Sequence, residues 1–234
     1  MLVGVDGHSD HPVEVIAALP KVGPDLTIDV AAVAALEPDL VLATLTVPGH
    51  EAVVEGLEAA GLPFIAPEPV SLEDVYGDIA NIGARLGVPE RSDQLILEMR
   101  SEIGSPPPDA PGPGILVQWW PKPVISPGRL SWVNDLIAAA GGVNPLGREA
   151  VISRPLNDAE VQEMRPDAIV ISWCGVDPEK YRPDVVLENP AWQELPAIQN
   201  GHVFCVPEAY LGRPGPRLLD GVRALRGVVA WMGA

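Results

Sequence analysis

Short apolar runs alternate with helix-like segments along the whole chain. Buried strands are predicted at residues 38–44, 62–66, 115–119, 166–173 and 201–207. Amphipathic or capped helices are predicted at residues 50–60, 71–86, 89–103, 131–140 and 217–232. Because strands separated by helices of this length pair in parallel, the pattern predicts an α/β fold built from parallel βα units.

A proline-rich segment at residues 105–114 interrupts this alternation. Proline fixes φ and removes a hydrogen-bond donor, so this stretch is neither a helix nor a central strand. We expect an extended, stiff connector there. The predicted division is an N-terminal lobe at residues 1–88, a linker helix and connector at 89–113, and a C-terminal lobe at 114–234.

The two halves of the chain resemble each other. Residues 29–44 align without a gap with residues 157–172, and residues 61–68 align with residues 201–208. Each half contains a capped short helix, Pro-Asp, a buried strand, a helix, a glycine, a strand and Pro-Glu. The repeat predicts two similar parallel-sheet lobes with Rossmann-like βα repeats.

The repeat also reveals a gap. The second lobe begins with a strand and a helix, roughly residues 114–142, and the first lobe has no counterpart. A lobe without this unit has an open sheet edge and exposed apolar surface. The sequence therefore indicates either that the native precursor is longer or that a partner chain covers the gap.

Composition and charge narrow the function. The 234 residues include 47% hydrophobic residues, enough for a substantial core, and the net charge is −17. Such an acidic surface argues against nucleic acid and anionic lipid as partners. No apolar run is long enough to span a bilayer, and no signal peptide is visible, so the chain is either cytoplasmic or begins after processing or truncation.

Aromatic residues gather where predicted strands end, which is where open parallel sheets bind ligands. The aromatic candidates are Trp119, Trp120, Trp132, Trp173, Tyr181 and Tyr210. They form either a platform for a flat or bulky ligand or part of the lobe cores. Alternation along a strand predicts that one ring of the Trp119–Trp120 pair faces inward and the other outward.

Polar candidates lie in three of the same loops. His8 and His11 are suited to orienting a ligand, and Asp10 between them is expected to cap the helix that begins near Pro12. No third clustered ligand accompanies the histidines, so no metal held by the protein alone is expected. Arg213 and Lys122 are candidate cations, although an arginine paired with a neighbouring acid is an equal alternative.

The sequence contains no enzyme motif, neither a nucleophile elbow, a P-loop, HExxH nor GxGxxG. The two cysteines, Cys174 and Cys205, form no CxxC pair. Cys174 follows a strand but has no basic neighbour in sequence, which favours an inert, partly buried thiol. We therefore expect a binding protein rather than an enzyme.

Several segments in the right order resemble the solute-binding proteins of ABC importers for cobalamin, haem and iron–siderophores. They are residues 2–12, 19–23, 35–43, 119–123, 127–128, 131–132, 140–144 and the closing Gly-Arg-Pro-Gly-Pro-Arg segment 212–217. The similarity covers nearly the whole chain and is greatest to the cobalamin-binding branch.

The resemblance implies two α/β lobes joined by a long backbone helix, here residues 89–103, with the ligand in the cleft between lobes. It implies a transported cobalt corrinoid, with cobalamin as the first choice, and no permanently bound cofactor. It also implies an ABC permease as partner and a periplasmic or other extracytoplasmic location. Family members dock through one glutamate per lobe. Glu51 matches in the first lobe, whereas Gly212 stands at the second position and Glu208 is the nearest acid.

Departures from the family pattern concentrate the aromatic surface in the second lobe. His11 lies where cobalamin binders place a tyrosine, and Thr44 lies where an aromatic residue can occur. The expected ligand-binding residues are His8, His11, Thr44, Trp119, Trp120, Lys122, Trp132, Trp173, Tyr210 and Arg213. The alternatives are a haem or ferric-siderophore binding protein, a cytoplasmic corrinoid or tetrapyrrole carrier without a transporter, and an enzyme acting on metal clusters or tetrapyrroles.

Overall fold

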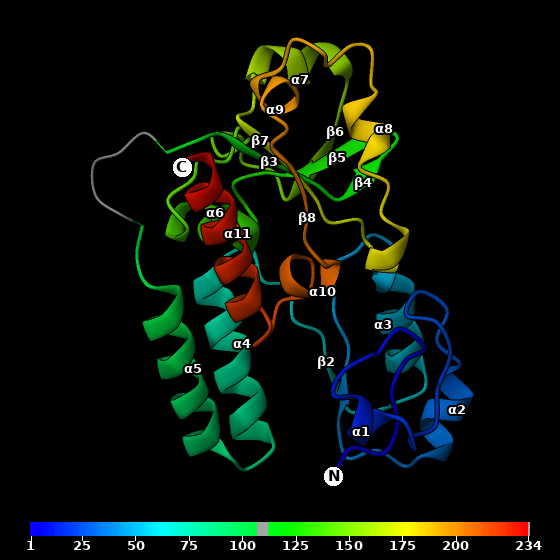
Figure 1. Ribbon diagram of the computed structural model, residues 1–234. Coiled ribbons are helices and arrows are strands. Elements are labelled where there is room, and N and C mark those ends of the chain that lie inside the picture. The colour runs from blue at the N-terminus through cyan, green and yellow to red at the C-terminus, as the bar shows by residue number, and fades with distance from the viewer. Residues whose placement is uncertain (107–111, 234) are drawn as a thin grey trace. The chain divides into compact units, whose positions relative to one another are not determined.

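The computed structural model describes residues 1–106 and 112–233, and the chain divides into two compact units, Met1–Glu68 and Pro69–Ala234 (Figure 1). The boundary falls at residue 68, whereas the sequence placed the end of the first lobe at residue 88. The segment between them is helix α4 (Leu72–Arg85), which packs against α5 (Pro89–Ile103) and α6 (Trp132–Ala139) of the second unit. The predicted connector falls largely on residues 107–111, which lie outside the described residues.

The first unit is a small parallel βα structure. Its elements are α1 (Val13–Ile16), α2 (Val30–Ala35), β1 (Val41–Leu42), α3 (His50–Ala59) and β2 (Phe64–Ile65). Strands β1 and β2 pair in parallel with Val41 opposite Phe64. Val22, Val33 and Leu57 form the buried centre of this unit.

One local expectation for this unit is wrong. Helix α1 has Pro12 as its N-cap residue and no side-chain hydrogen bond caps it, so Asp10 does not serve as the cap. The carboxylate of Asp6 instead organises the preceding loop, because it accepts hydrogen bonds from the backbone N–H groups of His8 (2.6 Å) and Ser9 (3.0 Å).

The second unit is built on a parallel sheet with strand order β3-β7-β8. These strands are β3 (Ile115–Gln118), β7 (Ala168–Ile171) and β8 (Val203–Cys205). The remaining helices of the unit are α7 (Asp158–Met164), η1 (Pro178–Lys180), α8 (Asp184–Leu187), α9 (Pro196–Gln199), α10 (Glu208–Leu211) and α11 (Leu218–Met232). The mixed α/β class and its parallel strands confirm the sequence-based prediction.

Alternate residues of the central strands face two separate cores. Val117 and Val170 pack with α5, α6 and α11, whereas Leu116 and Ile169 pack with residues of α7, α8 and α9 (Figure 1). A parallel strand buried on both faces needs an unbroken apolar run, and all four residues of β7 are fully buried. This apolar run is the reason why the sequence predicts a strand at residues 166–173.

A three-stranded antiparallel sheet, β4-β5-β6, was not predicted. It comprises β4 (Trp120–Pro121), β5 (Val124–Pro127) and β6 (Ser153–Leu156). The region contains four prolines, at positions 121, 123, 127 and 155, and its sequence pattern is typical of a loop. Proline cannot donate a backbone hydrogen bond to a neighbouring strand, so it argues against a strand prediction. Tertiary pairing overrides that preference and places Trp120 opposite Ile125.

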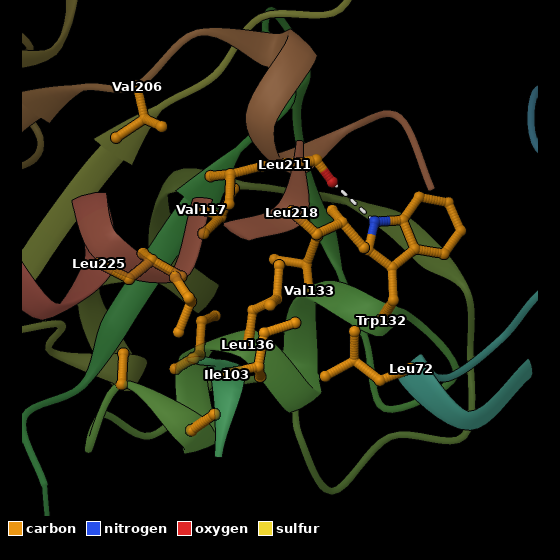
Figure 2. Packing of buried hydrophobic residues seen from close by; sticks show 14 of the residues in the cluster. Leu72, Ile103, Val117, Trp132, Val133, Leu136, Val206, Leu211, Leu218 and Leu225 are labelled. Atoms are coloured by element: carbon orange, nitrogen blue, oxygen red, sulfur yellow. Dashed lines mark hydrogen bonds between the residues drawn. The ribbon is translucent and has the colours of Figure 1, made fainter. Parts of the chain in front are cut away.

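The larger core of the second unit joins helices that are distant in sequence. Figure 2 shows Leu72, Val133 and Leu218 beside Trp132 in this core. Polar contacts add to this packing: the Leu72 N–H donates to a carboxylate oxygen of Asp135 at 2.9 Å. Helix α4 begins where the sequence predicted, with the Ser71 hydroxyl accepting from the Asp74 N–H.

None of the helices in residues 1–106 and 112–233 combines the length and the apolar character that crossing a bilayer requires.

Candidate functional site

The carboxyl ends of the three parallel strands of the second unit meet at one edge. The carbonyl of Trp119, just after β3, accepts a hydrogen bond from the N–H of Cys174, just after β7, at 3.1 Å. The N–H of Glu208, beyond β8, donates to the Tyr181 hydroxyl at 3.1 Å. Loops whose residues are up to 89 positions apart in the sequence therefore meet at this edge, and this is the edge at which open parallel sheets bind ligands.

Trp119 faces inward and Trp120 faces outward, as alternation along a strand predicted. Trp119 is partly buried and packs against the larger core, whereas 42% of Trp120 is exposed. The indole N–H of Trp119 is buried and has no hydrogen-bond partner among the described residues. Lys122 is exposed in the turn that follows β4. Trp120 is therefore the most exposed of the four candidate tryptophans.

Trp132 and Trp173 lie in two different cores. The indole N–H of Trp132 donates to the Leu211 carbonyl at 2.7 Å (Figure 2), and that of Trp173 donates to the side-chain oxygen of Gln118 at 3.0 Å. Both rings are buried, and each satisfies its only polar group inside the protein. The structure therefore does not present them together with Trp120 as one aromatic surface.

The two candidate tyrosines, Tyr181 and Tyr210, differ in burial. Tyr181 is buried against Trp173, with ring centroids 5.6 Å apart, and burial raises the pKa of its hydroxyl to about 12. Tyr210 is only partly buried, and the Arg217 guanidinium lies 5.5 Å from its ring centroid. Tyr210 and Arg217 together offer a flat face and a positive charge.

Glu208 and Arg213 form an ion pair, with Nε of Arg213 3.0 Å from a carboxylate oxygen of Glu208. The Glu208 side chain is only 13% exposed, because it lies against Gly212, where a Cβ atom would approach its carboxylate to 2.7 Å. The sequence left two alternatives open for Arg213, a contact to the ligand or a pair with a neighbouring acid, and the structure shows the pair. The carboxylate of Glu208 is therefore largely buried and paired with the Arg213 guanidinium, and a role for Glu208 in docking stays a prediction.

Cys174 lies beside this ion pair. Burial, reinforced by the nearby negative charge of Glu208, raises the pKa of its thiol to about 12. A thiol in this state is protonated and unreactive at neutral pH. Cys205, on β8, is exposed, and both cysteines are unpaired.

In the first unit, loops at the carboxyl edge bring His8, Asp25 and His50 together. Nδ1 of His8 lies 3.3 Å from one carboxylate oxygen of Asp25, and Nε2 of His50 lies 3.9 Å from the other. His50 is buried, and its Nδ1 has no hydrogen-bond partner among the described residues. Sequence reasoning did not single out His50, because a lone histidine at a helix start carries no signal until the Asp25 loop packs over it.

The other candidates of the first unit lie on separate loops. Thr44 donates to the Pro67 carbonyl at 3.4 Å and pairs with the Thr46 hydroxyl at 3.1 Å, and His11 is exposed. Glu51 is exposed in the first turn of α3, where its carboxylate accepts the Gly49 N–H at 2.7 Å. Hydrogen bonds from backbone N–H groups lower the pKa of Glu51, so it is ionised at neutral pH.

Within residues 1–106 and 112–233, no group of three or more histidine, cysteine or acidic side chains has a geometry that could hold a metal ion. The groups that the fold does gather are rings, guanidinium groups and hydroxyls, which recognise an organic ligand by contact and hydrogen bonding.

The fold and this edge define a two-lobed α/β binding protein. The chain belongs to the periplasmic binding protein family, whose sequence model matches residues 1–210. It is the substrate-binding protein of an ABC transporter, with a small-molecule ligand and a permease as partner. The matching family is one of binding proteins.

Two relatives and one solved structure illustrate this membership. The ABC transporter substrate-binding lipoprotein YvrC of Bacillus subtilis is 26% identical over 96% of this chain and 71% of the relative. The vitamin B12-binding protein of Vibrio cholerae is 26% identical over 94% of this chain and 78% of the relative. The periplasmic heme-binding protein RhuT from Roseiflexus sp. superposes with a TM-score of 0.82 at 25% identity, covering 99% of this chain and 90% of that one.

The family and the lipoprotein relative together indicate an extracytoplasmic location. The sequence-based identification of a solute-binding protein of the cobalamin, haem and siderophore group is therefore confirmed.

Proposed function

We propose that this protein captures cobalamin or a related corrinoid at the carboxyl-end loops of its sheets and delivers it to an ABC permease at the outer face of the membrane. The observation that carries the proposal is the similarity to the vitamin B12-binding protein of Vibrio cholerae along 94% of this chain. The aromatic and cationic edge of the second unit supports it, because a corrinoid is large, largely apolar on its faces and rimmed by amides.

Within the second unit, we assign the direct contacts to Trp120, Tyr210 and Arg213. The exposed indole of Trp120 supplies stacking area, and Arg213, held by Glu208, supplies hydrogen-bond donors in a fixed direction. Trp119 supports Trp120 from the core side. Trp132 and Trp173 act indirectly by fixing the loops on which these groups stand, and Lys122 remains a peripheral cation.

His8, His11 and Thr44 of the first unit are proposed as polar ligand contacts. That the residues of both units contact one ligand remains a prediction. We assign docking to Glu51, which is exposed and ionised at the start of α3. A Glu51→Lys variant is expected to keep its affinity for ligand and to lose delivery to the permease in reconstituted proteoliposomes.

Titration of the purified protein with cyanocobalamin, haemin and ferrichrome, followed by calorimetry and absorption spectra, tests the ligand. We expect saturable binding of cyanocobalamin. Trp120→Ala is expected to weaken it about tenfold through lost stacking area, whereas Trp231→Ala removes an even more exposed indole on α11 and leaves it unchanged. Absence of saturable binding to cyanocobalamin refutes the corrinoid assignment.

Haem is the second candidate, favoured by the similarity to RhuT. Its two carboxylates suit guanidinium groups such as those of Arg213 and Arg217. Saturable binding of haemin with a shifted Soret band, weakened by Arg217→Gln and accompanied by no cyanocobalamin binding, would reassign the ligand to haem.

A further inference from the structure

Helix α10 is hydrogen-bonded at both ends to buried aromatic side chains. At its first residue, the N–H of Glu208 donates to the Tyr181 hydroxyl at 3.1 Å. At its last residue, the Leu211 carbonyl accepts the Trp132 indole N–H at 2.7 Å (Figure 2). Trp132 belongs to the larger core, whereas Tyr181 belongs to the core that contains residues of α7, α8 and α9. A helix of four residues is not stable alone, so these contacts decide where α10 lies.

The Tyr181 hydroxyl joins two of the strand-end loops. It donates to the Trp173 carbonyl, beyond β7, at 3.3 Å, and it accepts from the Glu208 N–H, beyond β8. Burial raises the pKa of this hydroxyl to about 12, so it keeps its proton at neutral pH and can make both hydrogen bonds at once. The starting point of α10 is therefore fixed relative to the end of β7.

The residue that precedes α10 does not provide this support itself. The N-cap residue is Pro207, which makes no side-chain hydrogen bond to the helix. The first N–H groups of any helix have no partner inside the helix and need an acceptor from elsewhere. Tyr181, 27 positions earlier in the chain, supplies the acceptor for Glu208.

The position of Glu208 matters because it sets the direction of a guanidinium group. The Arg213 Nε–H donates to the Glu208 carboxylate at 3.0 Å. The Gly212 N–H donates to the Glu208 carbonyl at 2.7 Å, so the backbone just before Arg213 is attached to the same residue. A shift at the start of α10 would therefore move Arg213 through both its side chain and its backbone.

We propose that Tyr181 is a positioning residue for ligand binding, whose hydroxyl fixes the start of α10 and, through Glu208, aims the Arg213 guanidinium. Tyr181 itself does not contact the ligand, since its ring is buried against Trp173. The inference rests on the proposed function, in which Arg213 donates hydrogen bonds to the ligand. Such bonds weaken steeply when the donor leaves its preferred distance and angle.

Tyr181→Phe tests the first step in the ligand-free protein, because it removes the hydroxyl and keeps the ring that packs on Trp173. Hydrogen exchange followed by NMR reports the Glu208 amide and the Arg213 Nε–H. We expect both to exchange about tenfold faster in the variant, as expected for the loss of one hydrogen bond. The amides of α11 serve as an internal reference and are expected to keep their rates.

Tyr76→Phe is the matched control. It removes the hydroxyl of another buried tyrosine, which lies on α4 with the Arg100 guanidinium 4.3 Å from its ring centroid. This variant is expected to leave the exchange of the Glu208 amide and the Arg213 Nε–H unchanged.

A double-mutant cycle tests the second step. Calorimetric titration with cyanocobalamin compares the wild-type protein with Tyr181→Phe, Arg213→Ala and the double variant. We expect Tyr181→Phe to weaken binding about fivefold in the wild-type background and to have almost no effect once the Arg213 side chain is gone, because the hydroxyl acts through that side chain. A tyrosine that only stabilised the fold would weaken binding equally in both backgrounds.

Three results would overturn the proposal. The first is an unchanged exchange rate of the Glu208 amide and the Arg213 Nε–H in Tyr181→Phe. The second is faster exchange throughout α11 as well, which indicates general destabilisation. The third is equal weakening of binding with and without the Arg213 side chain. Absence of cyanocobalamin binding by the wild-type protein instead refutes the corrinoid assignment, and the exchange rates in the ligand-free protein still decide whether Tyr181 fixes α10 and Arg213.

Discussion

Replacing Trp132 with phenylalanine distinguishes a structural indole from a ligand-facing one. In the structure, the Trp132 N–H donates to the Leu211 carbonyl at 2.7 Å inside the larger core of the second unit. The variant leaves a buried carbonyl unpaired, which costs about 1–3 kcal/mol. The smaller ring loses roughly another 1 kcal/mol of packing.

We therefore expect Trp132→Phe to lower the free energy of unfolding by about 2–4 kcal/mol. Urea denaturation followed by far-UV circular dichroism measures this change without relying on tryptophan fluorescence. Trp231→Phe is the matched control, because Trp231 is exposed on α11, and it is expected to change stability by less than about 0.5 kcal/mol.

The opposite pattern would refute this reasoning. If Trp132→Phe unfolds at the same urea concentration as Trp231→Phe but binds cyanocobalamin more weakly, then Trp132 contacts the ligand and does not support the core. A loss of stability with unchanged affinity would show that Leu211 and the following loop keep their position without this hydrogen bond.

Two further predictions concern titratable groups. Iodoacetamide at pH 8 is expected to modify exposed Cys205 rapidly and Cys174 only after unfolding, because the raised thiol pKa of about 12 leaves little thiolate; equal rates in mass spectrometry would contradict this. Arg154 pairs with Glu149 at 2.6 Å and Glu160 at 2.7 Å; hydrogen bonds from Arg154 to Glu149, and from the backbone and Arg154 to Glu160, lower the pKa of both carboxyls. The two ion pairs stabilise the fold fully above the unfolded-state pKa near 4.5, and this stabilisation disappears as pH falls through the lower folded-state pKa values. Arg154→Ala should therefore lower Tm at pH 7 and have a diminishing effect in acid. A difference in Tm that does not depend on pH would exclude the ion-pair explanation.

The sequence alone determined the fold class, the two-lobed repeat and the family. These conclusions rest on features that are visible in short stretches of sequence, such as apolar runs and helix-capping residues. The buried strand at residues 168–171 is an uninterrupted apolar run, and Asn157 with Glu160 forms a capping box that marks its helix unambiguously.

Some local predictions failed because competing partners lie elsewhere in the chain. Asp10 has a residue type and spacing suited to capping, yet the helix begins after Pro12 without a side-chain cap. The antiparallel sheet β4-β5-β6 was not predicted, because proline residues are rare in strands and several stand in these three segments. The strands form because they pair with one another, and β6 lies about 30 residues further along the chain than β5.

Only the tertiary structure decided which of the candidate side chains are exposed. The sequence offered Trp120 and Trp132 as equal candidates. In the structure Trp120 is exposed, whereas Trp132 is buried and donates its indole N–H to the Leu211 carbonyl inside a core. Glu208 and Arg213 are five positions apart, and their pairing depends on a glycine that admits the carboxylate. The sequence had left this pair as one of two alternatives for Arg213. Exposure, in contrast, depends on atoms contributed by distant segments, such as the Leu211 carbonyl that binds the Trp132 N–H, and no local pattern encodes it.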